Sequence, residues 1–89
     1  MRNPKISVII TNYNLEKYIA RAIRSVINQS LKEDEFEIIV VDDCSTDNSI
    51  NIINNYVSNI KFIKNKMNLG LSSSLNLAIK LSKGKYVVR

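Results

Sequence analysis

The chain has 89 residues, of which 45% are hydrophobic, and its formal net charge is +5. This length and composition predict one globular domain, or part of one, and exclude a disordered or fibrous chain. With one cysteine, Cys44, and no histidine, an internal disulfide, a zinc site and a Ser-His or Cys-His pair are excluded. No apolar run approaches the roughly 20 residues of a membrane helix, and the first residues lack a signal-peptide pattern. We therefore expect a cytoplasmic domain.

Strand and helix patterns alternate along the first half of the chain. Residues 6–10 form a short β-branched run that predicts a strand. Residues 15–27 place apolar side chains at steps of three and four, which predicts a helix that Asn14 can cap. The charged segment 31–35 is expected to be a loop. Residues 38–41 are apolar at every position, which is typical of a strand buried on both faces of a parallel sheet.

The alternation continues through the second half. A second helix is expected after a cap provided by Ser45, Thr46 or Asp47. Its apolar face would consist of Ile50, Ile53 and Val57. Residues 60–63 predict a weaker strand, and a loop follows in which Gly70 can take a positive φ. A third helix would bury Leu71, Leu75, Ala78 and Ile79. A fourth strand is expected to begin at Tyr86.

This order predicts an α/β fold: a Rossmann-like open, mostly parallel sheet with helices on both faces and about four β/α units. Ligands of such sheets bind outside the carboxyl ends of the strands, where the polar loops 11–14, 42–45 and 65–70 would lie. Asp42 and Asp43 are therefore expected on the rim of the sheet and not in a core. Capping of the second helix is the alternative role, which we weigh equally for Asp42, whereas for Asp43 we favour ligand binding.

Several ligand-binding classes do not fit these loops. The loop after the first strand lacks the glycines of a dinucleotide-binding fold, and no P-loop motif occurs. A receiver domain carries its acid pair after the first strand and a further aspartate later, but here the pair follows the second strand and no acid follows Asp47. Residues 48–89 contain cations and no acid, yet they lack aromatics interleaved for stacking on bases. We therefore do not expect a nucleic-acid partner, and keep that class as the least favoured alternative.

Four blocks in this order, ISVIITNYN, SVINQS, EIIVVDDCSTDNS and NLGLSSSLNLAIKLSKGKYVV, closely resemble the start of inverting family 2 glycosyltransferases. The resemblance covers essentially the whole chain. It implies a partial GT-A fold, in which residues 1–89 are the N-terminal nucleotide-sugar-binding half, truncated before the D-x-D motif. The complete enzyme would transfer a sugar from a nucleoside diphosphate, with UDP favoured, to a saccharide or lipid-linked acceptor hydroxyl with inversion, in cell-wall or polysaccharide biosynthesis. The fragment itself is expected to be inactive; the alternative is a nucleotide-binding module without turnover.

The resemblance also assigns site residues. It implies that Thr11 and Tyr13 line the nucleobase pocket, that Asp43 accepts a hydrogen bond from the base, and that Asp42 holds the loop. Further donor-site residues implied in this way are Asn68, Gly70 and Asn76. Cys44 stands where the family often has glycine, a replacement that is tolerable if φ is negative there.

The resemblance implies three further properties of the complete enzyme. A divalent metal, Mn²⁺ or Mg²⁺, is expected, with its ligands and the catalytic base beyond Arg89. The protein can be peripheral to the inner face of the membrane. If the chain stands alone, the edge of its sheet is exposed, so we also expect self-association through that edge.

Overall fold

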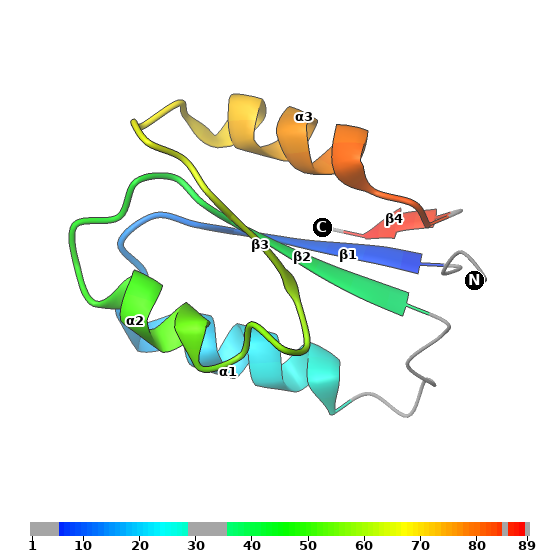
Figure 1. The fold of residues 1–89 in the computed structure, drawn as a ribbon, viewed down its shortest axis with the longest axis horizontal. Coiled ribbons are helices and arrows are strands. Elements are labelled where there is room, and N and C mark those ends of the chain that lie inside the picture. Colours follow the sequence, from blue (N-terminus) through cyan, green and yellow to red (C-terminus); the bar gives the residue numbers. More distant parts are fainter. Residues whose placement is uncertain (1–5, 29–35, 85, 89) are drawn as a thin grey trace.

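A computed structural model describes residues 6–28, 36–84 and 86–88. Four strands, all parallel, form one sheet in the order β3-β2-β1-β4. The strands are β1 (Ile6–Asn12), β2 (Phe36–Asp42), β3 (Lys61–Lys64) and β4 (Tyr86–Val88). The helices α1 (Glu16–Ile27) and α2 (Ser49–Asn54) cover one face of the sheet, and α3 (Leu71–Leu81) covers the other (Figure 1). The predicted α/β fold with helices on both faces is therefore confirmed.

The central strand β2 explains why the core has two halves. Successive side chains of a strand point to opposite faces, so an uninterrupted apolar run supplies both. Ile38 and Val40 pack with α1 and α2, in a core cluster completed by Ile19, Ile23 and Ile53. Ile39 and Val41 pack toward α3, in a second cluster completed by Ile9 and Ala78.

The apolar faces predicted for α2 and α3 are wrong in part. The helix α2 ends at Asn54, so Val57 lies outside it and is 49% exposed. In α3 the buried residues are Ser74 and Ala78, one helical turn apart, whereas Leu71 and Ile79 are 63% and 44% exposed. The predicted loop at residues 31–35 lies outside the described residues. No helix in the described ranges is long and apolar enough to cross a membrane.

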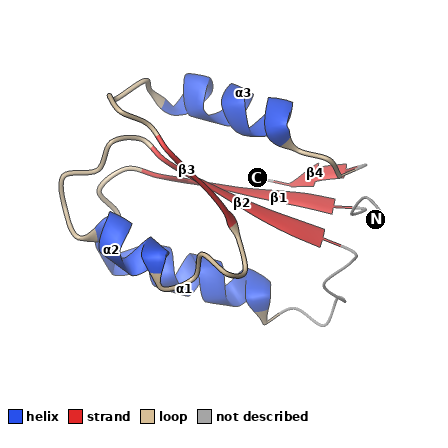
Figure 2. Ribbon diagram, viewed as in Figure 1, coloured by secondary structure: helices blue, strands red, loops and turns tan. Residues whose placement is uncertain are grey.

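The connections bring three loops to one end of the sheet. The chain moves outward from β1 to β2 to β3, and α3 then carries it back to β4 on the other side of β1. The strand order therefore reverses between β1 and β4, and such a reversal opens a ligand-binding crevice at the carboxyl ends of the strands. The loops after β1, β2 and β3 gather at that end, on the left of Figure 2.

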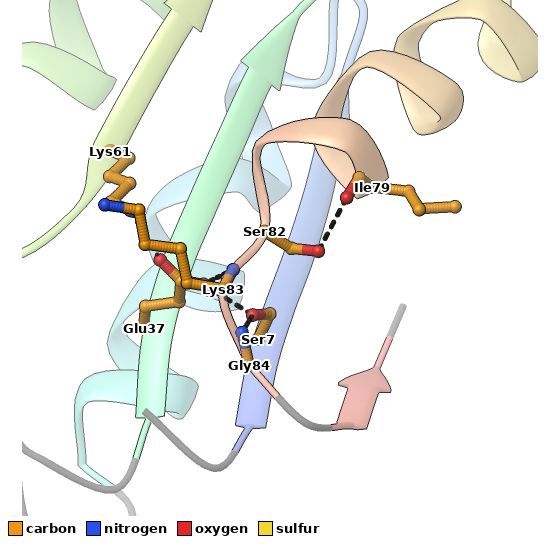
Figure 3. Close-up of polar contacts among 7 residues, drawn as sticks. All are labelled: Ser7, Glu37, Lys61, Ile79, Ser82, Lys83 and Gly84. Carbon is orange, nitrogen blue, oxygen red and sulfur yellow. Dashed lines mark hydrogen bonds and ion pairs between the residues drawn. The ribbon is translucent and has the colours of Figure 1, made fainter. Parts of the chain in front are cut away.

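The opposite end of the sheet is held by a polar network (Figure 3). Oε2 of Glu37 accepts hydrogen bonds from the Ser7 hydroxyl at 2.5 Å and from the Lys83 amide at 2.6 Å. Nζ of Lys61 lies 2.7 Å from Oε1 of Glu37. The Gly84 amide donates to the Ser7 hydroxyl oxygen at 2.8 Å. This network joins β1, β2, β3 and the segment that leads from α3 to β4.

Candidate functional site

The loop after β1 presents two of the residues predicted to bind a ligand. Thr11 is half-buried near the end of the strand, and the side chain of Tyr13 is 47% exposed. Asn14 follows with φ of 54°. Asparagine tolerates this left-handed conformation better than most residues do. The turn at Asn14 leads the chain from the strand into α1.

Asp42 is fully buried, at 0% exposure, where β2 ends. Its Oδ1 accepts hydrogen bonds from Nδ2 of Asn12 at 2.8 Å and from the Ser45 hydroxyl at 2.7 Å. Its Oδ2 accepts a hydrogen bond from the Ser45 amide at 2.9 Å. The expectation that Asp42 is not buried is therefore wrong. These donors replace water around the carboxylate, so Asp42 closes the turn after β2 and ties it to β1.

Asp43 is also buried, with 6% of its surface exposed. Its Oδ1 accepts hydrogen bonds from the Leu69 amide at 2.7 Å and from Nδ2 of Asn65 at 3.0 Å. Its Oδ2 accepts the Gly70 amide at 2.9 Å. The Leu69 amide is the main cause that lowers the pKa of Asp43; burial raises this pKa, but Asn65, Gly70 and the Ser74 hydroxyl lower it further. Asp43 therefore stays ionised and anchors the loop after β3, instead of capping α2.

Asp47 joins the starts of two helices; its contact with the second agrees with its place among the predicted caps, whereas its contact with the first was not predicted. Its Oδ2 accepts a hydrogen bond from the Glu16 amide at 3.1 Å, at the start of α1, and its Oδ1 accepts the Ser49 amide at 2.9 Å, at the start of α2. Burial raises the pKa of Asp47, but the hydrogen bonds from Ser49 and Glu16 outweigh it and lower the pKa. This carboxylate lies where both helix dipoles favour negative charge.

Asn14 makes the reciprocal contact between the same two loops. Its Oδ1 accepts hydrogen bonds from the Thr46 amide at 2.7 Å and the Asp47 amide at 3.2 Å. Its own amide donates to the Ser45 hydroxyl oxygen at 2.9 Å. The expectation that Asn14 caps α1 is wrong, since its side chain is engaged across the loops and the amide of Glu16, the first residue of α1, donates to Asp47 instead. Together with Asp47, Asn14 holds the loop that carries Tyr13.

The lowered pKa values of Asp43, Asp47 and Glu37 predict sensitivity to acid. Burial raises the pKa of Glu37, but Lys61, Ser7 and the Lys83 amide lower it. A carboxyl group whose pKa is lower in the folded protein stabilises the fold above its unfolded pKa and loses that contribution as the pH falls through the folded pKa. We expect the free energy of unfolding to stay level from about pH 7 to pH 5 and to fall below about pH 4. Urea unfolding across this range checks the sign, and a rise on acidification would contradict it.

The remaining predicted residues lie in the loop after β3 and on α3. Gly70 has φ of 88°, which confirms the predicted positive φ. Its amide is shared between Asp43 and Oδ1 of Asn68, 3.1 Å away. Asn76 is exposed on α3, and no hydrogen bond recorded among the described residues joins it to the other predicted site residues. The structure therefore joins Asn68 and Gly70 to Asp43 through hydrogen bonds, whereas among the described residues Asn76 makes no such link.

Cys44 adopts a left-handed conformation with φ of 64°, so the expectation of a negative φ is wrong. Its Sγ lies 3.6 Å from the Lys66 carbonyl oxygen, a weak contact. A side chain at this conformation costs roughly 1–2 kcal/mol. The cost is local strain in the turn between Asp42 and Ser45.

Replacing Cys44 by glycine is expected to stabilise the protein. Relief of the strain exceeds the extra chain entropy that glycine gains in the unfolded state, by about 0.5–1 kcal/mol of unfolding free energy. The variant Cys44→Val should destabilise it, because a β-branched side chain fits this φ poorly. Urea unfolding of both variants measures the difference. A less stable Cys44→Gly variant would contradict the assigned strain.

An apolar groove of about 440 Å³ lies beside the loop after β1 and is lined by Ile9, Ile10, Thr11, Leu71 and Leu75.

No group of three or more histidine, cysteine or acidic side chains that could hold a metal ion occurs in the described ranges. The carboxylates of Asp42, Asp43 and Asp47 are all turned toward N–H or O–H donors. A cation is bound by carboxylate oxygens that face it, whereas these oxygens face hydrogen-bond donors. The residues present therefore do not fit a metal site.

Comparison with known proteins identifies the family. Residues 7–89 match glycosyl transferase family 2. Poly(ribitol-phosphate) beta-glucosyltransferase of Bacillus spizizenii is 40% identical over 88 residues, which are 94% of this chain and 14% of that protein. Poly(ribitol-phosphate) beta-N-acetylglucosaminyltransferase TarS of Staphylococcus aureus is 37% identical over 94 residues, and the match covers 94% of this chain and 15% of that protein. The chain thus spans about a seventh of the length of these relatives.

Solved structures agree with this match. Residues 1–349 of S. aureus TarS, in complex with UDP-GlcNAc, superpose with a TM-score of 0.86 at 40% identity over 93% of this chain and 25% of that one. A mannosyltransferase from Pyrobaculum calidifontis, in complex with GDP-Man and Mn²⁺, superposes with a TM-score of 0.87 at 23% identity, over 98% of this chain and 27% of that one, and this likeness shows the shared fold alone. The chain belongs to glycosyl transferase family 2.

Proposed function

We propose that the three loops at the carboxyl ends of β1, β2 and β3 bind the nucleotide of a nucleoside-diphosphate sugar. UDP is the favoured nucleotide, since TarS, which is 40% identical, has been solved with UDP-GlcNAc and with UDP. The whole protein would transfer the sugar to an acceptor hydroxyl with inversion. These 89 residues would supply the donor-nucleotide subsite only and would not turn over alone.

The observation that carries the proposal is the state of the Asp43 carboxylate. An ionised carboxylate offers about four lone-pair positions. In Asp43, hydrogen bonds from the Leu69 amide, from Nδ2 of Asn65 and from the Gly70 amide occupy three of them. Of these three donors only the Gly70 amide is on Oδ2; the Ser74 hydroxyl also acts on the carboxylate, and in this proposal a position on Oδ2 takes the ligand. The imide N–H of uracil is a donor of the kind that this position accepts. Tyr13, which is 47% exposed, offers a ring on which a base can stack.

The remaining site residues have supporting roles in this proposal. Thr11 would line the nucleobase pocket beside Tyr13, and Asp42 would hold the turn that carries Asp43. Asn68 and Gly70 would form the rim of the donor site, and Asn76 would approach the donor from α3.

The metal, the acceptor and the location extend the proposal to the whole protein. A divalent metal, Mn²⁺ or Mg²⁺, is expected there, but the residues described here do not hold it and no step is assigned to it. A saccharide or lipid-linked acceptor in a cell-wall polymer is proposed because the relatives named above act on poly(ribitol-phosphate).

Cytoplasmic location stays a prediction. Self-association through the β4 edge also stays a prediction, and light scattering at rising protein concentration would test it.

Calorimetric titration with UDP and with CDP tests the nucleotide proposal. Cytosine has no proton on N3 and cannot donate to Asp43 as uracil does. Since a hydrogen bond to a charged group contributes about 1.5–3 kcal/mol, we expect CDP to bind about 10-fold to 100-fold more weakly than UDP. Equal affinity for the two nucleotides, or no UDP binding, would contradict the proposal.

A further inference from the structure

Two buried side chains lie behind the Asp43 carboxylate. Asn65, which directly follows β3, is 7% exposed, and Ser74, on α3, is 1% exposed. Nδ2 of Asn65 donates one hydrogen bond to Oδ1 of Asp43 at 3.0 Å and one to the Ser74 hydroxyl oxygen at 3.1 Å. Both hydrogen atoms of this side-chain amide are therefore used.

The backbone fixes where these two side chains begin. The Asn65 amide donates to the Asp42 carbonyl oxygen at 2.9 Å, and the Ser74 amide donates to the Gly70 carbonyl oxygen at 3.1 Å. A reversed Asn65 side chain would place its amide oxygen against the ionised Asp43 carboxylate, and the two would repel each other. The charge of Asp43 thus selects one orientation of Asn65, and the Ser74 hydroxyl accepts the second N–H of that orientation.

This arrangement makes the two oxygens of Asp43 unequal. Oδ1 is held by the Asn65 side chain and the Leu69 amide, whereas Oδ2 accepts the Gly70 amide; the Ser74 hydroxyl also acts on this carboxylate and lowers its pKa. Rotation of the carboxylate would break the hydrogen bond to Asn65. Oδ2 is therefore the oxygen left with room for a further donor.

We propose that Asn65 and Ser74 are positioning residues for nucleotide recognition, which fix the Asp43 carboxylate so that Oδ2 accepts the ring N–H of the base. The inference rests on the function proposed above. It goes further by assigning base discrimination to two residues that do not touch the nucleotide. Without Ser74, Asn65 loses one partner and can turn away; without Asn65, the carboxylate can rotate.

The test compares the affinities of UDP and N3-methyl-UDP, which differ at the proton that Asp43 would accept. Calorimetry on the whole chain gives the ratio of the two dissociation constants, and this ratio is unaffected by a general loss of affinity. Since a hydrogen bond to a charged group is at stake, we expect a ratio of about 10 or more for the unmodified chain. The ratio should fall at least about threefold in Ser74→Ala and approach about 1 in Asn65→Ala.

Ser49→Ala is the matched control. Ser49 is also a buried serine, at 0% exposure, and it belongs to α2, whereas Ser74 belongs to α3. This variant should keep the ratio of the unmodified chain. Ser74→Thr retains a hydroxyl and should restore most of the ratio. Circular dichroism checks that each variant is folded, and Ser74→Ala decides the outcome if Asn65→Ala does not fold.

Each result has one meaning. A reduced ratio in Ser74→Ala, with the ratio retained in Ser49→Ala, supports the positioning role. If Ser74→Ala lowers the affinity for both ligands by the same factor, or changes neither affinity, the positioning role is overturned while the proposed function stands. If the unmodified chain binds neither ligand, or binds both equally, the proposed function fails and the positioning role is overturned with it.

Discussion

Replacing Asp42 with alanine is expected to lower the free energy of unfolding by about 3–5 kcal/mol, because buried donors lose their acceptor. Nδ2 of Asn12 and the amide and hydroxyl of Ser45 all donate to this carboxylate, which is 0% exposed. A loss of this size is a large share of the total stability of a typical small domain. Urea unfolding followed by circular dichroism measures it.

Two further variants show whether the effect comes from these hydrogen bonds. Asp42→Asn keeps one oxygen acceptor but turns an NH₂ group toward a donor, so its loss should fall between those of alanine and the unmodified chain. Glu16→Gln removes the same charge from an exposed position and should change stability by less than about 0.5 kcal/mol. A loss below about 1 kcal/mol for Asp42→Ala would show that the turn does not depend on this carboxylate.

Gly84→Ala is expected to lower the free energy of unfolding by about 2–4 kcal/mol, because the added methyl group has no room. An ideal Cβ at this position would lie 2.5 Å from the Ser7 amide nitrogen and 2.7 Å from the Ile6 carbonyl carbon, and it would also overlap the Ser7 hydroxyl oxygen. Two of these atoms belong to the backbone of β1, so the segment before β4 must move away. The same denaturation measurement applies.

Two controls accompany Gly84→Ala. Ser73→Ala adds no atoms at an exposed position of α3 and should be nearly neutral. In a Ser7→Ala background the hydroxyl clash is gone but the backbone clash remains, so Gly84→Ala should still cost more than about 1 kcal/mol. If the cost disappears in that background, the close backbone approach is not its cause.

The fold could be predicted because burial leaves a local pattern in this chain. The uninterrupted apolar run from Ile38 to Val41 identifies a strand covered on both faces, and the alternation of strands and helices implies a parallel sheet. The exposed flank of α3 could not be predicted, because Leu71 and Ile79 fit an apolar helical face as well as Ala78 does. Which row of side chains is buried depends on how the helix lies on the sheet.

The meeting of the three loops was predicted, but the contacts between them were not. Strand ends of a parallel sheet meet at one edge, so the loops that carry Tyr13, Asp43 and Gly70 were expected together. Helix-capping rules consider near neighbours, whereas Asp47 meets the Glu16 amide 31 positions away and Asp43 meets the Gly70 amide 27 positions away. For the same reason the burial of Asp43 could not be foreseen, because its donors come from the loop after β3.

Mapping UDP onto the chain by amide NMR tests most directly the claim that the nucleotide binds at the carboxyl ends of the strands. As UDP is added, shifts should concentrate in the amides of Tyr13, Leu69 and Gly70, together with those of residues 42–45. The amides of Ser7, Lys83 and Gly84, at the opposite end of the sheet, should stay unchanged (Figure 3). Shifts confined to that opposite end, or no shifts at saturating UDP, would contradict the claim.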